Sequence, residues 1–401
     1  MPSELSTLPT LRQSSVRAVL ETILRDGPTS RAEIARSTGL SKQTISDVMR
    51  DLEQDGWVQE RGQVQGAIGR SALNYEIRAR SALALAVDLG GTKLHVGLAD
   101  LSGELVAEIE EPTDPRGGVR VVGQVGRLTA RLVAEAGVER ESIRCGVMGS
   151  PGVVDGATGG ITVAPNVPGL DAIDVREALH RELGFPVSIE NDVNLAAVGE
   201  RWRGANRDSA TFAFIAIGTG IGLGLVADGR LVRGTRGAAG EIAYLPIGGD
   251  PFDARTHRRG TLETAVGSTA ILERYAGLGG DAASVREIFA ALGTGDAAAA
   301  AAIDEVARVV ALAVLSVSCF LDPEIVVFGG SIGSRPELLA QIDRHLARCM
   351  AEPVRTAIST LGSRATLIGA IGLSLDHLRS GLFGLPPRLH GRSSARETVA
   401  A

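Results

Sequence analysis

Apolar residues in the first 60 positions recur every three or four residues, which is the spacing of helices with one buried face. The first such stretch predicts a helix that ends at Gly27-Pro28. Its inward positions are Val16, Val19, Leu20, Ile23 and Leu24. Ser30 and Glu33 have the spacing of a capping box, which predicts that a short second helix begins there. That helix is expected to end at the turn 37–40.

A third helix is predicted to follow this turn, capped by Ser41 and ended by Gly56-Trp57-Val58. Its inward positions are Ile45, Val48, Met49 and Leu52. Short polar side chains remain on the outward side near its N-terminus, where they can reach base edges and phosphates. The residues of this helix that we expect to contact DNA are Ser41, Lys42, Gln43, Thr44 and Ser46.

Residues 58–78 alternate in the manner of two strands around a glycine-rich tip that carries Arg61 and Arg70. Helix, turn, helix and hairpin in this order indicate a winged helix-turn-helix, and we expect Arg70 to contact DNA as well. A three-helix interaction module with a solvated polar face is the alternative. One copy of such a head would bind DNA weakly, so we expect a homodimer or homotetramer on a two-fold operator.

After residue 80 the helical spacing gives way to apolar strands that end in glycine-rich turns. The strand 83–87 leads into the turn 88–93, a second turn at 218–222 joins two apolar strands, and Gly329-Gly330 follows the strand 325–328. Backbone N–H groups in such turns can cradle phosphates, and Asp88 could hold Mg²⁺ through water. Three such turns indicate two related α/β lobes that close on a nucleotide.

Composition and charge narrow the classes of protein. The 401 residues are 44% apolar and 22% charged, which is typical of a folded globular chain with two or three domains. Residues 1–80 carry 11 Lys or Arg against 10 Asp or Glu, and the remainder carries 30 against 37. The acidic remainder would repel DNA phosphates, so we expect any DNA contact to belong to the N-terminal part.

Three cysteines at 145, 319 and 349 lie far apart in apolar surroundings, which favours buried thiols in a reducing compartment over a disulfide framework. We find no pattern of a signal peptide or of a membrane-spanning helix in the sequence. A cytoplasmic protein without a membrane partner is therefore expected.

Several motifs resemble the ROK family of repressors and sugar kinases, within the actin and hexokinase fold superfamily. They are DLGGTK at 88–93, GSPGVVD at 149–155, PNVPG at 165–169, ENDVNLAAVGE at 190–200 and IGTGIGLGLVADGRLVRGTRGAAGEI at 217–242. The resemblance implies a two-lobed domain behind the winged helix, with a sugar at the base of a cleft. We expect the boundaries 1–80 for the winged helix, 81–195 for the first lobe, 196–385 for the second lobe with a C-terminal helix returning to the first, and 386–401 for a mobile tail.

A sugar hydroxyl is a poor nucleophile, so phosphoryl transfer needs a carboxylate that accepts its proton. Asp192, at the end of the predicted strand PVSIEND, is our candidate for this base. The resemblance implies that the sugar contacts are Asn166, Asn191, Asp192, Glu241, Tyr244 and Glu263. The turns that could bind ATP with Mg²⁺ contain Asp88, Gly90, Gly91, Thr92, Lys93, Gly218, Thr219, Gly220, Gly222, Gly329 and Gly330.

Many members of this family hold a structural zinc ion with one histidine and three cysteines after the motif GEI. Aligned on Glu241 and Glu263, those four positions are Tyr244, Ala254, Thr256 and Thr261. Zinc requires thiolate or imidazole ligands, which none of these residues provides. The lone His257 between arginines is interpreted as a solvated loop residue, so we predict that the protein binds no zinc and requires no cofactor.

Three classes of function remain open. The first is a sugar-responsive regulator, in which the ROK part senses a sugar or sugar derivative and the winged helix binds operator DNA as a repressor or activator. The second is an ATP-dependent sugar kinase, because the turns at 88–93 and 218–222 are intact. The third is a binding protein with a vestigial sugar site. We favour the regulator, since a kinase needs no helix-turn-helix, and leave kinase activity open.

Overall fold

The structure is a computed structural model of the whole chain and describes residues 10–65, 71–154, 160–162, 167–257 and 259–385. The chain divides into two compact units, each described here by itself. Unit 1 comprises Met1–Met148, Asn166–Ile189 and Ala370–Arg388, and unit 2 comprises Gly149–Pro165, Glu190–Gly369 and Leu389–Ala401. Within the described residues, no helix is long and apolar enough to cross a membrane.

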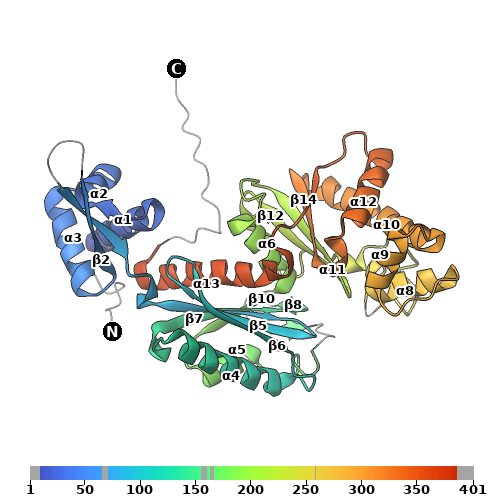
Figure 1. Cartoon of the computed structure of the whole chain (residues 1–401), viewed down its shortest axis with the longest axis horizontal. Coiled ribbons are helices and arrows are strands. Elements are labelled where there is room, and N and C mark those ends of the chain that lie inside the picture. The colour runs from blue at the N-terminus through green and yellow to red at the C-terminus, as the bar shows by residue number, and fades with distance from the viewer. Residues whose placement is uncertain (1–9, 66–70, 155–159, 163–166, 258, 386–401) are drawn as a thin grey trace. The chain divides into compact units, whose positions relative to one another are not determined.

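Unit 1 begins with a helical head that carries a small antiparallel sheet (Figure 1). The elements are α1 (Thr10–Asp26), β1 (Thr29–Ser30), α2 (Arg31–Thr38), α3 (Lys42–Gln54), β2 (Val58–Gln65) and β3 (Ser71–Ile77). The predicted capping box is present, because the Ser30 hydroxyl accepts from the Glu33 N–H and the Glu33 carboxylate accepts from the Ser30 N–H. Gly39 then ends α2 in the left-handed conformation, with φ of 71°.

The apolar face of α3 forms much of the core of the head. All four predicted inward residues of α3 are buried, namely Ile45, Val48, Met49 and Leu52. Trp57 directly after α3 is fully buried, and its ring meets that of Phe383 edge to face at 4.9 Å between centroids. Phe383 is the last residue of the long helix α13 (Ala365–Phe383), so the head packs on the end of that helix.

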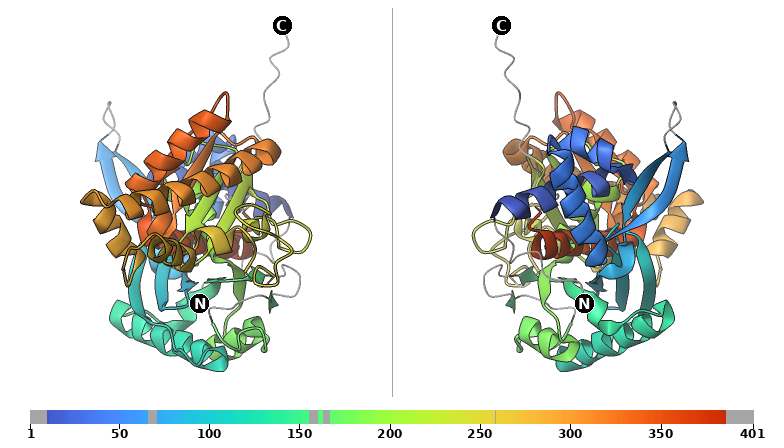
Figure 2. Two further views of the ribbon diagram at one scale, coloured as in Figure 1. Left: turned by 90° about the vertical axis from the view of Figure 1, so that its right-hand side faces the viewer. Right: turned by 90° about the vertical axis from the view of Figure 1, so that its left-hand side faces the viewer.

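The rest of unit 1 is a five-stranded sheet of order β10-β7-β4-β5-β6. Its elements are β4 (Leu83–Leu89), β5 (Lys93–Asp100), β6 (Leu105–Pro112), α4 (Gly118–Ala136), β7 (Ile143–Ser150), α5 (Val175–Leu183) and β10 (Val187–Asn191). Helices α4 and α5 cover one face of the sheet and α13 lies along the other (Figures 1 and 2). On that second face the Ser374 hydroxyl donates to the carbonyl of Leu85 at 2.9 Å.

Unit 2 contains a second five-stranded sheet, of order β13-β12-β11-β14-β15. The strands are β11 (Phe212–Ile217), β12 (Ile221–Ala227), β13 (Arg230–Leu231), β14 (Ile325–Gly329) and β15 (Thr356–Ile358). The main helices are α6 (Asp192–Arg203), α7 (Glu263–Val266), α8 (Ser268–Gly277), α9 (Val285–Gly293), α10 (Ala297–Leu321), α11 (Gly330–Gly333) and α12 (Pro336–Cys349). A short hairpin joins β8 (Val153–Val154) to β9 (Ile161–Thr162).

The central strand β11 shows how this sheet is buried on both faces. Phe212 and Phe214 pack with alanines of α6, whereas Ala213, Ile215 and Ile217 belong to the core built around α10 and α12. Side chains alternate along a strand, so a continuous apolar run serves two layers of helices. The order of layers in unit 2 is therefore α6, sheet, and α10 with α12.

Two expectations about local structure are wrong. The turn at Gly329-Gly330 leads from β14 into α11, and β14 pairs parallel with β11, so it is a strand-to-helix turn and not a hairpin. Cys319 and Cys349 are exposed rather than buried, because each lies on the solvent side near the end of its helix. Cys145 is half-buried, and burial raises the pKa of its thiol to about 12.

Candidate functional site

The predicted base lies at the junction of β10 and α6, where a strand end becomes a helix start. The Asn191 side chain caps α6, since its oxygen accepts from the N–H groups of Val193 and Asn194 at 2.9 and 3.0 Å. Its amide nitrogen donates to the carbonyl of Gly152 at 3.0 Å. Asn191 thus fixes the first turn of the helix that presents Asp192.

A buried ion pair that sequence reasoning missed holds the same junction. Glu190 is 7% exposed, and one of its carboxylate oxygens accepts from the Arg233 guanidinium at 2.6 Å. The other oxygen accepts from the N–H of Asn191 and from the side chain of Asn194. The signal was present, because Glu190 stands next to the Asn-Asp pair and Arg233 lies within the glycine-rich motif. Neither residue has a sequence spacing that would indicate their contact.

Asp192 is the first residue of α6 and is half-buried. Burial raises the pKa of its carboxyl to about 6, the negative charge of Glu241 raises it further, and the N–H of Val193 acts in the opposite direction. Its backbone carbonyl accepts from the Thr366 hydroxyl at 3.2 Å. A carboxylate with this pKa is ionised at neutral pH and more basic than an ordinary aspartate, which suits a group that accepts a proton from a hydroxyl.

Glu241 and Glu263 extend this acidic group within unit 2. Glu241 is exposed as a whole residue, yet protein atoms around its carboxyl raise its pKa and the charge of Glu263 raises it further. Burial also raises the pKa of Glu263, while the N–H of Ile221 and the charge of Arg259 lower it. The three predicted carboxylates therefore influence one another electrostatically. Hydroxyl groups of a sugar are suitable donors for such a group.

The other predicted sugar contacts are less defined. Tyr244 lies in a short 3-10 helix (Ile242–Tyr244) directly after Glu241, and it is 46% exposed. Asn166 lies outside the described residues. The structure thus brings Asn191, Asp192, Glu241 and Glu263 into one unit.

The turn between β11 and β12 contains Gly218, Thr219, Gly220 and Gly222, and it lies beside Glu263. The N–H of Ile221 donates to the Glu263 carboxylate at 3.3 Å. A Cβ atom at Gly220 would come within 2.1 Å of that carboxylate, so only glycine allows this approach. The predicted phosphate turn and a predicted sugar contact are therefore adjacent.

The turn Gly329-Gly330 lies next to this one, because β14 is the parallel neighbour of β11. Gly330 has φ of +79°, and a Cβ atom there would come within 2.4 Å of the Ile217 carbonyl. A Cβ atom at Gly218 would contact the Ser331 hydroxyl at 3.5 Å. Two of the three predicted phosphate turns are thus side by side in unit 2.

The first predicted phosphate turn belongs to unit 1 and joins β4 to β5. The N–H of Gly90 donates to the Lys93 carbonyl at 2.8 Å, which closes a tight antiparallel hairpin as expected. Gly91, Thr92 and Lys93 are exposed, and Asp88 is half-buried. Lys93 forms an ion pair with Glu110 of β6 at 2.5 Å, so its ammonium group is directed along the sheet.

The loop that carries zinc ligands in many ROK proteins is closed here by hydrogen bonds. Thr256 is buried, and its hydroxyl donates to the carbonyl of Asp253 at 2.8 Å. Thr261 is 3% exposed, and the neighbouring Leu262 N–H donates to the Ala243 carbonyl at 2.9 Å. Ala254 and His257 are exposed. In the part of the chain that the structure describes, no three His, Cys, Asp or Glu side chains form a group that could hold a metal ion.

The predicted DNA-contacting residues occupy the start and the outer side of α3. Ser41 caps the helix, since its hydroxyl accepts from the Thr44 N–H at 3.1 Å. Lys42 and Gln43 are exposed, and Ser46 is half-buried. Arg61 lies in β2 rather than at the tip of the hairpin and forms an ion pair with Glu76 at 2.6 Å. Arg70 lies outside the described residues.

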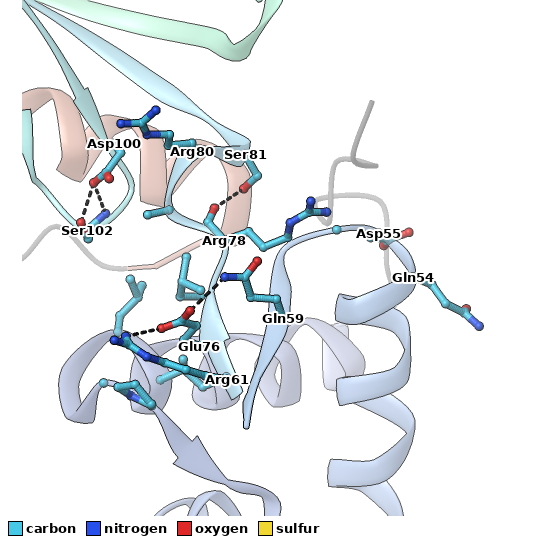
Figure 3. Close-up of a pocket in the computed structure, with 17 residues that line it drawn as sticks. Gln54, Asp55, Gln59, Arg61, Glu76, Arg78, Arg80, Ser81, Asp100 and Ser102 are labelled. Atoms are coloured by element: carbon cyan, nitrogen blue, oxygen red, sulfur yellow. Dashed lines mark hydrogen bonds and ion pairs between the residues drawn. The ribbon is translucent and has the colours of Figure 1, made fainter. Parts of the chain in front are cut away.

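A cavity of about 1040 Å³ lies in unit 1, between the head and the linker that follows it. Figure 3 shows that its acidic side chains are engaged, Glu76 with Gln59 and Arg61, and Asp100 with Ser102. None of the predicted sugar contacts lines this cavity. It is therefore a separate feature from the carboxylate group of unit 2.

Two family comparisons match most of the chain. The ROK family matches residues 84–377, and the winged helix-turn-helix DNA-binding family matches residues 13–59. The two matches follow one another along the chain. Together they account for both the body and the head described above.

Individual relatives include both kinases and repressors. A glucokinase from Halalkalibacterium halodurans is 31% identical over 71% of this chain and 92% of its own length. A xylose repressor from Caldicellulosiruptor bescii is 25% identical over 92% of this chain and 97% of its own.

Solved structures agree on the fold. A ROK hexokinase from Thermus thermophilus is 32% identical, covers 74% of this chain with 98% of its own, and has a TM-score of 0.62. A ROK family transcriptional regulator, a homologue of the E. coli MLC protein, is 24% identical and covers 93% of this chain with 98% of its own, with a TM-score of 0.75. The chain belongs to the ROK family and carries an N-terminal winged helix-turn-helix.

Proposed function

We propose that this protein is a sugar-responsive, DNA-binding transcription regulator of carbohydrate metabolism, and that it acts as a repressor. The head binds operator DNA through α3, with Lys42, Gln43 and Thr44 nearest to the bases and Arg70 on the wing. Unit 2 binds a sugar or sugar derivative through its carboxylates. Ligand binding then changes the affinity for the operator, which requires that the sugar prefers one of two states.

One observation carries this proposal: a winged helix-turn-helix with an exposed polar face on α3 occurs in the same chain as a group of carboxylates with raised pKa values. A kinase has no use for the head, whereas a regulator needs both parts. The xylose repressor, which is similar along nearly the whole chain, supports the same combination.

We further propose that Asn166, Asn191, Asp192, Glu241, Tyr244 and Glu263 contact the sugar. Asn191 already uses its oxygen twice to cap α6, so only an amide N–H remains for a ligand. The boundaries at residues 80, 195 and 385 remain our division of the chain into head, two lobes and tail. We place the regulator in the cytoplasm as a homodimer or homotetramer.

A second function, sugar phosphorylation by ATP, is favoured by one specific observation. The pKa of about 6 leaves Asp192 suited to accept a proton, and the paired glycine turns of unit 2 lie next to Glu263. Exposed backbone at the turns of both units fits phosphates, and Asp88 fits a magnesium ion held through water. ATP would supply the phosphoryl group. The same residues do not fit zinc, since the loop 248–261 offers hydroxyl groups in place of thiolates.

Selection of DNA by the full-length protein tests the regulator. The protein is mixed with a library of random duplexes, and the captured duplexes are sequenced with and without each member of a panel of sugars and sugar derivatives. We expect one two-fold symmetric motif and at least one sugar that changes affinity for it by about fivefold or more. A folded protein that enriches no sequence contradicts the proposal.

Turnover with ATP and Mg²⁺ over the same panel tests the kinase. Wild type is compared with Asp192→Asn, which keeps the size of the side chain and removes the base. We expect any turnover to fall by about a hundredfold or more in the variant. Turnover that survives the substitution refutes Asp192 as the base, and this result leaves the regulator untouched.

A further inference from the structure

The outward face of α3 carries an acid between two residues that could read bases. Asp47 lies four residues after Gln43 and three before Arg50, so the three side chains share one side of the helix. The amide nitrogen of Gln43 donates to both carboxylate oxygens of Asp47, at 3.2 and 3.1 Å. The Arg50 guanidinium donates to the same carboxylate at 2.9 Å.

Two other acids of α3 have a different role. Asp51 forms an ion pair with Arg12 of α1, and Glu53 forms one with Arg31 of α2 at 3.0 Å. These pairs connect α3 to the other helices of the head. The bonds of Asp47 described above run only to residues of α3 itself, so they organise the exposed face rather than the packing of the head.

The Gln43 bond fixes which end of its amide is presented. An ionised carboxylate can only accept hydrogen bonds, so the nitrogen end of Gln43 must face Asp47. One N–H and the carbonyl oxygen remain for a partner. This donor and acceptor pair matches the N7 and N6 edge of adenine in the major groove.

The charge of Asp47 acts on any duplex. A carboxylate on this face repels phosphates and the acceptor atoms of bases, and its bond to Arg50 competes with contact between Arg50 and a phosphate. Sequence-independent affinity comes mainly from cations that meet phosphates. An acid at this place therefore lowers affinity for every sequence, and more for those that Gln43 cannot read.

We infer that Asp47 is the specificity-determining residue of this head: it holds Gln43 and Arg50 in the pose that reads one sequence and weakens binding to all others. This inference rests on the proposed function as a DNA-binding regulator. Asp47 is a positioning residue in this scheme, because it acts through Gln43 and Arg50 rather than through a required contact of its own.

The test uses full-length protein and three variants. Asp47→Ala removes both the charge and the bond to Gln43, whereas Asp47→Asn removes the charge and keeps an acceptor for Gln43. Asp26→Asn is the matched control, since it also removes one acid from the head, at the end of α1, where Asp26 pairs with Arg25 at 2.6 Å. Each protein selects duplexes from the random library, and affinities for the selected and a scrambled duplex are measured over a range of salt concentrations.

For Asp47→Ala we expect affinity for the scrambled duplex to rise about tenfold and the preference for the selected duplex to fall about tenfold. The slope of log affinity against log salt should steepen by about one unit, as Arg50 gains a phosphate. Asp47→Asn should show the gain on scrambled DNA while keeping the adenine preference. Asp26→Asn should behave as wild type.

Two results overturn the inference. One is an Asp47→Ala protein that selects the wild-type sequence with the wild-type preference, and the other is a folded Asp47→Ala protein that has lost all DNA binding. Melting temperatures of the variants separate misfolding from either result. A wild-type protein that selects no sequence is a different failure, because it contradicts the proposed function itself.

Discussion

At the scale of single residues, Asp192 is the group whose surroundings change its chemistry most. Its pKa of about 6 exceeds the ordinary value of 3.8, because burial and the charge of Glu241 both disfavour the ionised form. The folded protein therefore holds the Asp192 proton more strongly than the unfolded chain does. The stability that Asp192 contributes is present at low pH and is lost as pH rises from about 4 through 6.

We predict that Asp192→Asn flattens part of the dependence of stability on pH. From about pH 4 to pH 7 the free energy of unfolding of wild type should fall relative to the variant by at most about 3 kcal/mol, since the asparagine side chain in the variant does not titrate. Denaturant melts at several pH values measure this difference. Parallel curves for the two proteins would show that Asp192 titrates normally.

Thr256 illustrates a replacement that sequence comparison alone cannot interpret. We predict that Thr256→Val lowers the free energy of unfolding by about 1–2 kcal/mol, because it leaves the Asp253 carbonyl without its buried donor. Thr264→Val is the control, since Thr264 is exposed and water can replace its bond. A chelator such as EDTA should leave the melting temperature of wild type unchanged. A decrease with EDTA contradicts a metal-free loop.

At the scale of elements, the β11–β12 turn shows glycine used for contact within the protein. We predict that Gly220→Ala destabilises unit 2 by about 1–3 kcal/mol, since the new methyl group would overlap the Glu263 carboxylate. Gly293→Ala is the matched control, because a Cβ atom there meets nothing within 4 Å in the described structure. Thermal melts compare the two. Equal effects would mean that the turn can move away from Glu263 without cost.

The same scale shows what the sequence can predict. The helices of the head were predictable because capping residues and apolar spacing act locally, as at Ser30, Glu33 and Ile45. The turn after β14 was misassigned, since a strand followed by two glycines can lead into a hairpin or a helix. Only the parallel pairing of β14 with β11 decides between them, and that pairing is not local. The pair of Glu190 with Arg233 was missed for the same reason.

At the scale of the whole molecule, α13 is the element that belongs to both units. Its residues 365–369 fall in unit 2 and the rest in unit 1. In unit 2 its start contacts α6 closely, since a Cβ atom at Gly369 would come within 1.8 Å of the Leu195 carbonyl. In unit 1 its end packs on Trp57 of the head. The helix is thus a covalent connection between residues next to Asp192 and the core of the head.

We predict that Phe383→Ala lowers the free energy of unfolding of the head by about 3 kcal/mol, because Phe383 is only 5% exposed and its ring contacts Trp57. Hydrogen exchange of the amides in α3 should become faster. Phe320→Ala is the control, since Phe320 lies near the end of α10 and is 91% exposed. Unchanged exchange in α3 after Phe383→Ala would mean that the head is stable without α13.

The contact of Trp57 with Phe383 also makes the protein its own optical probe. The chain contains two tryptophans, and the other, Trp202, lies under the guanidinium of Arg203. After Trp202→Phe the indole of Trp57 is the sole tryptophan fluorophore, and in its present dry environment it should emit at short wavelength. A red shift on adding a sugar or a duplex would then report, without any label, that the head has left the end of α13.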